Sequence, residues 1–131
     1  MSEGYTMIEL VVVIILIGIL SAVAVPRFER RIELTEIKNE KDFTYTLWEE
    51  LEVYAEEQKE LTGTEIWPEH PLSVLGRTRN VIITYSLGIP DEDNEWQFDG
   101  TKLYHRRMNN EIWYFEYNPN TFFLSEHPTK L

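Results

Sequence analysis

The feature that most constrains this chain is an apolar run near its start, from Tyr5 to Val25, which contains one charged residue, Glu9. As an α-helix this run of 21 residues would extend about 31 Å, which matches the hydrocarbon thickness of a bilayer. A charged side chain deep in a bilayer costs about 2.5 kcal/mol or more, so it normally has a partner. The run therefore predicts a membrane-spanning helix in which Glu9 has a specific task.

The N-terminal sequence resembles that of type IV pilin-like precursors, the group that includes pilins and the pseudopilins of type II secretion. The resemblance consists of a short leader ending in Gly4, an aromatic residue at Tyr5, Glu9 four residues later, and the apolar run up to Pro26. These features coincide over about 24 of the 131 residues. The resemblance implies a leader that is cut off, a membrane-anchored helix, and assembly into a homo-oligomeric helical filament.

The resemblance also implies a role for individual residues. A prepilin peptidase would cut after Gly4, where the missing side chain lets an enzyme close around the bond, and would methylate the new amine of Tyr5. The carboxylate of Glu9 would neutralise the N-terminus of a neighbouring subunit, which lowers the desolvation cost of both charges; the alternative is a carboxylate at the lipid headgroups. Gly18 and Pro26 weaken the helix, because glycine is a poor helix former and Pro26 removes one hydrogen bond, so each could let it bend or melt during packing.

The leader, residues 1–4, is shorter and more acidic than the family's leaders. Arg27, Arg30 and Arg31 follow the apolar run, and the positive-inside rule would place them in the cytoplasm. The resemblance implies the opposite orientation, with a cytoplasmic leader and an exported C-terminal domain. An ordinary single-span anchor is one alternative; a secretory signal peptide fits poorly, since the chain has no basic n-region.

Composition limits the classes of function. The net charge is −11, from 12 Lys and Arg against 23 Asp and Glu, so binding to nucleic acid through bulk charge is disfavoured. The chain has no cysteine, which excludes disulfides, thiolate metal sites and a thiol nucleophile. With 43% apolar residues and 13% aromatic residues, the sequence can build one compact domain in addition to the anchor.

Beyond the apolar segment, residues 5–26, the helix is expected to continue as an amphipathic helix over residues 27–63, with Gly63 as its stop. Apolar residues recur there at spacings of three and four, and the stripe comprises Ile32, Ile37, Phe43, Leu47, Leu51, Tyr54 and Leu61. Six glutamates occupy its other faces: Glu49, Glu50, Glu52, Glu56, Glu57 and Glu60. We expect the apolar stripe to pack on a globular head. The acidic faces are either solvated or a surface for basic patches on adjacent subunits.

The head, residues 64–131, begins with an irregular crossover, because Pro68 and Pro71 exclude regular helix and central strand. Strand-like runs follow at Asn80–Leu87, Glu95–Phe98, Lys102–Arg106, Glu111–Tyr117 and Thr121–Ser125. Asp99-Gly100 predicts a type I′ hairpin, and residues 118–120 predict a second turn. The expected fold is α+β: a long N-terminal helix packed on a small C-terminal antiparallel sheet of three or four strands, as in pilins.

Catalytic chemistry is not apparent in the sequence. His70, His105 and His127 are far apart and lack metal-ligand spacing, so packing or surface roles are expected. No serine-hydrolase elbow or phosphate-binding loop is present. One acidic turn, residues 90–95, could bind Ca²⁺ through Asp91, Asp93 and Glu95, although it lacks the glycine and distal glutamate of an EF-hand loop. The alternative for this turn is a solvated acidic loop.

These observations predict a non-enzymatic structural subunit of a type IV pilus, with the prepilin peptidase and the pilus or secretion assembly machinery as partners. The subunit would be a single-pass protein of the bacterial inner membrane before assembly and part of an extracellular pilus afterwards. The alternative is a type II secretion pseudopilin or minor pilin in a periplasmic filament. A membrane-anchored enzyme is the remote alternative.

Overall fold

The computed structural model describes residues 4–76 and 81–131. Two predicted features, the leader residues before Gly4 and the start of the first strand at Asn80, lie outside these ranges. The chain divides into two compact units, residues 1–39 and 40–131. One α-helix, α1 (Met7–Thr62), supplies most of the first unit and continues into the second. The expected helix is therefore confirmed, and it begins two residues later than Tyr5.

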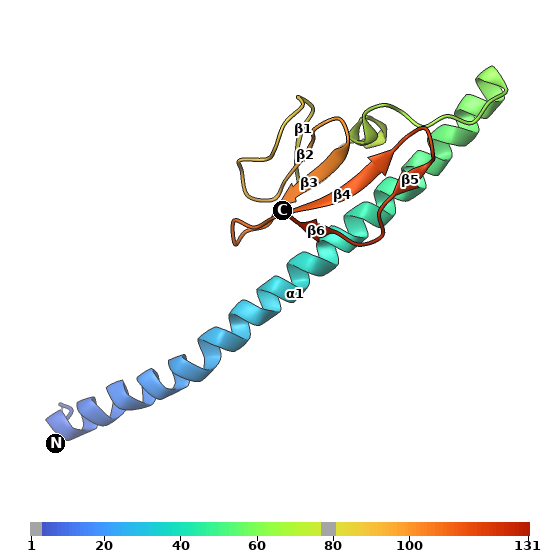
Figure 1. Cartoon of the computed structure of the whole chain (residues 1–131). Helices are drawn as coiled ribbons and strands as arrows, with labels where there is room; N and C mark the ends of the chain where they lie inside the picture. Colours follow the sequence, from blue (N-terminus) through green and yellow to red (C-terminus); the bar gives the residue numbers. More distant parts are fainter. Residues whose placement is uncertain (1–3, 77–80) are drawn as a thin grey trace. The chain divides into compact units, whose positions relative to one another are not determined.

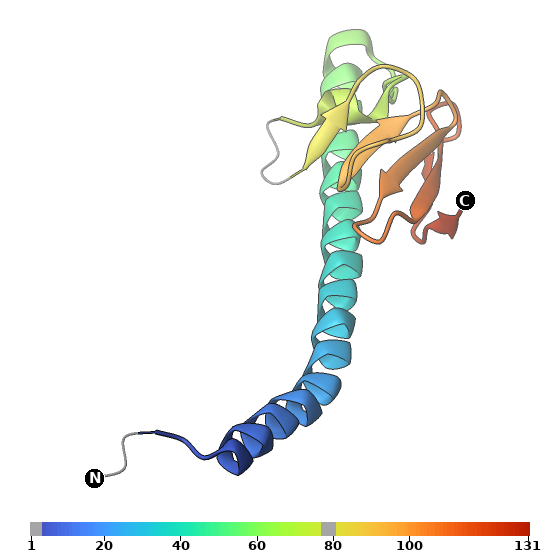
Figure 2. The same ribbon diagram turned by 90° about the vertical axis from the view of Figure 1, so that its left-hand side faces the viewer.

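In its described residues the second unit adds a short 3₁₀ helix, η1 (Pro71–Val74), and six strands to the C-terminal part of α1. The strands are β1 (Ile82–Thr84), β2 (Glu95–Phe98), β3 (Lys102–Arg106), β4 (Ile112–Asn118), β5 (Phe123–Leu124) and β6 (Thr129–Lys130). They form one sheet in the order β1-β2-β3-β4-β5, with β6 paired to β4. The sheet lies against the cyan-to-green part of α1 (Figures 1 and 2). The predicted α+β fold, a long helix packed on a small sheet, is confirmed.

The sheet differs from the expected antiparallel meander of three or four strands. The described residues form six strands, and β6, which was not predicted, pairs with β4 out of sequence order. β1 runs parallel to β2, with Ile83 level with Trp96, whereas all other pairs are antiparallel. A parallel pair needs a connection that returns to the starting end of the sheet. Residues 85–94 provide this connection, and their chain covers the outer face of β2. Gln97 on that face is buried and donates a hydrogen bond to the carbonyl of Ser86.

The hairpin between β2 and β3 is present, but its turn is not type I′. A type I′ turn needs positive φ at both central residues. Gly100 has φ +106°, while Asp99 is not among the residues with positive φ. The Asp99 carboxylate instead accepts hydrogen bonds from the amides of Thr101 and Lys102, at 2.8 and 2.6 Å, and these bonds fix the turn.

The core of the second unit is built from one face of α1, the crossover, and the facing side of the sheet. Its buried members are Leu47, Leu51, Ala55, Trp67, Leu72, Leu75, Trp96, Phe98, Leu103, Phe115, Tyr117 and Leu124. The predicted apolar stripe is therefore right at Leu47 and Leu51. It is wrong at Ile32, Ile37 and Leu61, which are 44%, 39% and 79% exposed, because the buried positions of α1 run only from Glu40 to Ala55.

Gly63 ends α1 as the sequence predicts. Its φ is +82°, in the left-handed region, and its amide donates a 2.8 Å hydrogen bond to the carbonyl of Lys59. This closes the last turn in the manner of an αL cap, for which glycine is preferred.

Candidate functional site

The start of α1 is held by reciprocal hydrogen bonds between Thr6 and Glu9. The Thr6 hydroxyl accepts the Glu9 amide at 3.1 Å, and the Glu9 carboxylate accepts the Thr6 amide at 3.3 Å. This arrangement is a capping box, which satisfies two backbone donors that a helix start leaves unpaired. The Thr-x-x-Glu spacing signals it in the sequence, and our prediction for Glu9 did not use that signal. Glu9 is thus positioned by the helix start itself.

The two residues expected at the cleavage site, Gly4 and Tyr5, precede α1. The Tyr5 side chain is 88% exposed, and within residues 4–76 and 81–131 no atom other than those of the adjoining residues lies within 4 Å of where a side chain at Gly4 would begin. A peptidase could therefore approach this bond. Cleavage would leave the new amine on Tyr5, directly before the capping residue Thr6. Cleavage and methylation remain predictions.

The apolar segment of α1 is uncovered in the structure. Its large side chains between Met7 and Val25 are 47–83% exposed. By length and composition this helix could cross a membrane: its most apolar window has a mean hydropathy of 3.0, and none of that window is buried within the chain. Burial of this much apolar surface would be strongly favourable, so it needs lipid or protein around it.

Gly18 and Pro26 both lie inside α1, which continues through them. Apart from the neighbouring backbone of α1 itself, a side chain at Gly18 would meet no atom of the described residues within 4 Å. The proline removes one helical hydrogen bond without ending the helix. Their proposed role as points of flexibility during packing remains a prediction.

A buried charged cluster joins α1 to the sheet within the second unit. The Glu40 side chain is 3% exposed and accepts hydrogen bonds from Arg107 Nε at 3.0 Å and Arg107 Nη2 at 2.8 Å. His105 Nδ1 lies 2.6 Å from the same carboxylate. Burial alone would raise the pKa of Glu40, but the hydrogen bonds from His105 and Arg107 outweigh it and hold the pKa below its ordinary value.

Aromatic rings and an amide complete this cluster. His105 stacks on Trp96 with ring centroids 4.4 Å apart, and its Nε2 lies 3.1 Å from Asn94 Oδ1. The Arg107 guanidinium lies 4.2 Å from the centre of the Trp113 ring. The predicted packing role of His105 is confirmed. Both oxygens of the Glu40 carboxylate accept hydrogen bonds, so the cluster holds α1 to the sheet.

The acidic turn places its carboxylates in different environments. Glu95 points inward and accepts hydrogen bonds from the amides of Asp91 and Glu92, at 3.0 and 2.9 Å, and from the Thr84 hydroxyl. These bonds outweigh burial, which would raise the pKa of Glu95, and lower that pKa. Asp93 instead forms an ion pair with Arg106 at 3.5 Å. Across residues 4–76 and 81–131, no three His, Asp or Glu side chains form a group suited to a metal ion.

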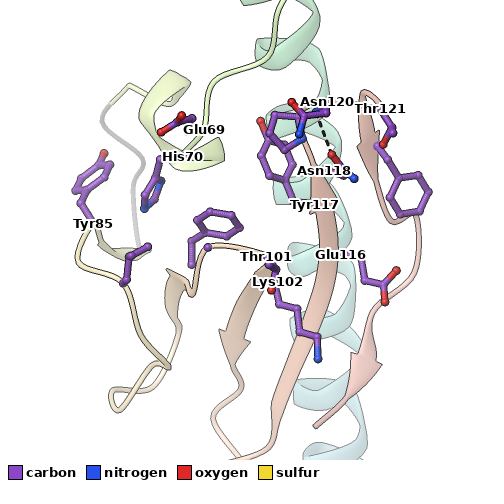
Figure 3. A pocket seen from close by; sticks show the side chains of 15 residues that line it. Glu69, His70, Tyr85, Thr101, Lys102, Glu116, Tyr117, Asn118, Asn120 and Thr121 are labelled. Carbon is purple, nitrogen blue, oxygen red and sulfur yellow. Dashed lines mark hydrogen bonds between the residues drawn. The ribbon is translucent and has the colours of Figure 1, made fainter.

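An open groove of about 880 Å³ lies on the head (Figure 3). Its lining includes the buried rings of Phe98 and Tyr117, together with exposed Asn118 at the end of β4 and exposed Asn120 in the turn that follows. The Tyr117 hydroxyl donates to the carbonyl of Pro68 at 2.5 Å, and burial raises the pKa of Tyr117. Burial also lowers the pKa of His70 at the other side of the groove. The groove combines aromatic and amide groups with charged or titratable side chains, among them Glu69, His70 and Lys102.

Comparison with known proteins gives one informative similarity. Over 45 residues the chain is 47% identical to the type IV narrow pilus major component PilA5 of Thermus thermophilus. The match spans 34% of this chain and only 36% of that relative. No family model and no solved structure matches the chain. The partial similarity supports a pilin-like protein with a structural role.

Proposed function

We propose that this protein is a structural subunit of a type IV pilus filament, assembled from the membrane by packing of α1 after removal of the leader. The observation that carries the proposal is the exposed apolar segment of α1, whose one charge is placed in its first turn. A filament core made of such helices would cover that surface. The pilus component that shares 47% identity over 45 residues supports the same function.

In this mechanism Glu9 has two successive partners. In the single chain its carboxylate accepts the amide of Thr6. In the filament the cationic amine of a neighbouring subunit, freed by cleavage before Tyr5, would pair with it. Entry of either charge alone into an apolar core would be costly, and pairing lowers that cost. Incorporation of a subunit would therefore depend on the charge of Glu9.

Mass spectrometry of the N-terminus in filaments sheared from cells tests the processing. The expected result is a chain that begins with methylated Tyr5 and dominates the filament preparation. An intact Met1 in filaments would refute cleavage. Correctly processed chain at trace abundance would instead favour the alternative of a pseudopilin or minor pilin.

Two matched substitutions separate the charge of Glu9 from its capping role. Glu9→Gln keeps an oxygen that can cap the helix but removes the charge, while Thr6→Val removes the hydroxyl cap and leaves the charge. We expect Glu9→Gln to reach the membrane in normal amounts but to lower filament yield at least tenfold, with Thr6→Val close to wild type. The reverse pattern would show that Glu9 acts through the helix cap.

A further inference from the structure

Two exposed stripes on α1 carry opposite charge with the same spacing. The basic stripe consists of Arg30, Arg31, Lys38 and Lys41, and the acidic stripe consists of Glu49, Glu50, Glu57 and Glu60. In both stripes the members lie at relative positions 0, 1, 8 and 11. At roughly 100° per residue, each set covers about 100° of the helix circumference. Each stripe is therefore a single continuous face.

Both stripes are available for contact. All eight side chains are exposed, and none forms an ion pair within residues 4–76 and 81–131. The acidic stripe lies on the side of α1 opposite the positions buried against the sheet, such as Leu47 and Leu51. Nothing in the described part of the head covers it. Four glutamates on one uncovered face repel one another, so a basic partner would relieve that repulsion.

We propose that the acidic stripe of one subunit docks on the basic stripe of a second copy of this chain, with the two helices parallel and displaced by 19 residues, about 28 Å. This inference rests on the proposed filament. The displacement follows from the shared spacing, since it brings all four opposite charges level at once. Two different surfaces meet, so the contact is heterologous and repeats into an open assembly instead of closing into a dimer.

The same register also brings one like-charged pair and one apolar pair level with each other. It brings Glu33 level with Glu52, each about 60° outside its stripe on the helix circumference, as one like-charged pair against four opposite pairs. It also brings exposed Leu34 level with exposed Val53, which allows an apolar contact between the charged pairs. Exposed ion pairs are individually weak and screened by salt. The stripes would therefore set the register of helices that the apolar segments hold together.

Anionic lipid headgroups are the alternative partner for the basic stripe, because it follows the apolar segment. Residues 27–41 contain five basic and four acidic residues, so their net charge is only +1. A lipid surface responds to the summed charge near it. A second protein helix instead meets one face, where the positive charges are concentrated. The charge distribution therefore favours another copy of the chain.

Charge reversal in cells that assemble the full chain tests the register. We expect Lys38→Glu and Glu57→Lys each to lower the yield of sheared filaments at least fivefold, normalised to subunit in the membrane. The double variant, which restores an opposite pair in reverse, should return to within twofold of wild type. Glu126→Lys makes the same charge change at an exposed head residue and should leave the yield unchanged.

The outcomes separate this inference from the proposed function. If the wild-type chain forms no filaments, the proposed function itself is wrong. If it does and both single variants assemble normally, the stripes do not dock. Loss in both single variants without rescue in the double variant would overturn the 19-residue register. Loss with Lys38→Glu alone would assign the basic stripe to lipid headgroups and overturn docking between subunits.

Discussion

Removing the charge of Glu40 should destabilise the head more than any other single change of a glutamate on α1. Glu40→Gln keeps the size of the side chain but leaves Arg107, whose side chain is 6% exposed, without its buried anion. Removing one partner of a buried ion pair typically costs about 3–5 kcal/mol, because the remaining charge stays desolvated. The hydrogen bond between His105 Nδ1 and the Glu40 carboxylate, at 2.6 Å, also loses its charged acceptor, which adds to the effect. We expect a loss of about 3–5 kcal/mol in the free energy of unfolding.

Tryptophan fluorescence of the full chain in detergent micelles measures this change. All four tryptophans belong to the second unit, and they are Trp48, Trp67, Trp96 and Trp113. The signal therefore reports unfolding of the head. With a urea dependence of about 1–3 kcal/mol per M, Glu40→Gln should lower the urea midpoint by more than about 1 M. Glu57→Gln, an exposed change on the same helix, should stay within about 0.5 kcal/mol of wild type.

The result that would refute this reasoning is a Glu40→Gln variant within about 1 kcal/mol of wild type. A double-mutant cycle with Arg107→Gln then identifies the source of the effect. If the pair acts as a unit, the double variant should lose less than the sum of the two single losses, by about 0.5–3 kcal/mol. Additive losses would mean that Glu40 and Arg107 stabilise the head independently of each other.

Three further predictions use the same fluorescence assay. Burial would raise the pKa values of Glu40 and Glu95, but hydrogen bonds lower both, so their stabilisation is present above about pH 4.3 and is lost as the pH falls through their lower folded-state values. The urea midpoint should fall in that range, and an unchanged midpoint down to pH 3 would contradict the signs. Gly63→Ala, at φ +82°, should cost about 1–2 kcal/mol, whereas no loss would show that the αL cap is dispensable. Millimolar Ca²⁺ should not change the melting temperature, since the inward-facing Glu95 is held by backbone amides; a rise would establish a calcium site at the acidic turn.

Local patterns predicted the elements of this fold well. The apolar spacing around Leu47 and Leu51 placed α1 against the sheet, and Gly63 marked its end because left-handed backbone favours glycine. Strands β2, β3 and β4 follow from alternation and turn residues. The parallel direction of β1 was not predictable in this way. It depends on the path of residues 85–94, which tertiary packing decides and local propensity does not.

Buried charge was the part of the structure that sequence reasoning missed. Glu40 stands in a helix rich in glutamate, and nothing beside it in the sequence distinguishes it from exposed Glu57. Its partners lie 65 and 67 residues away, on β3 and just after it. The cap formed by Thr6 and Glu9 differs, because its spacing of three residues is local and is a known helix-start signal. Long-range polar clusters need the fold, whereas local caps do not.

A comparison of Glu9 with Glu40 shows which partner the Glu9 carboxylate lacks among the described residues. Glu40 meets a guanidinium and an imidazole in its buried site, whereas Glu9 meets only the Thr6 hydroxyl and amide, and no ion pair involves it within residues 4–76 and 81–131. A carboxylate that enters an apolar surrounding with so few donors needs a cation from outside the chain. A structure of the assembled filament should therefore place a cationic group of another subunit within about 4 Å of the Glu9 carboxylate. A filament core in which Glu9 keeps only its Thr6 contacts would contradict charge neutralisation as its task.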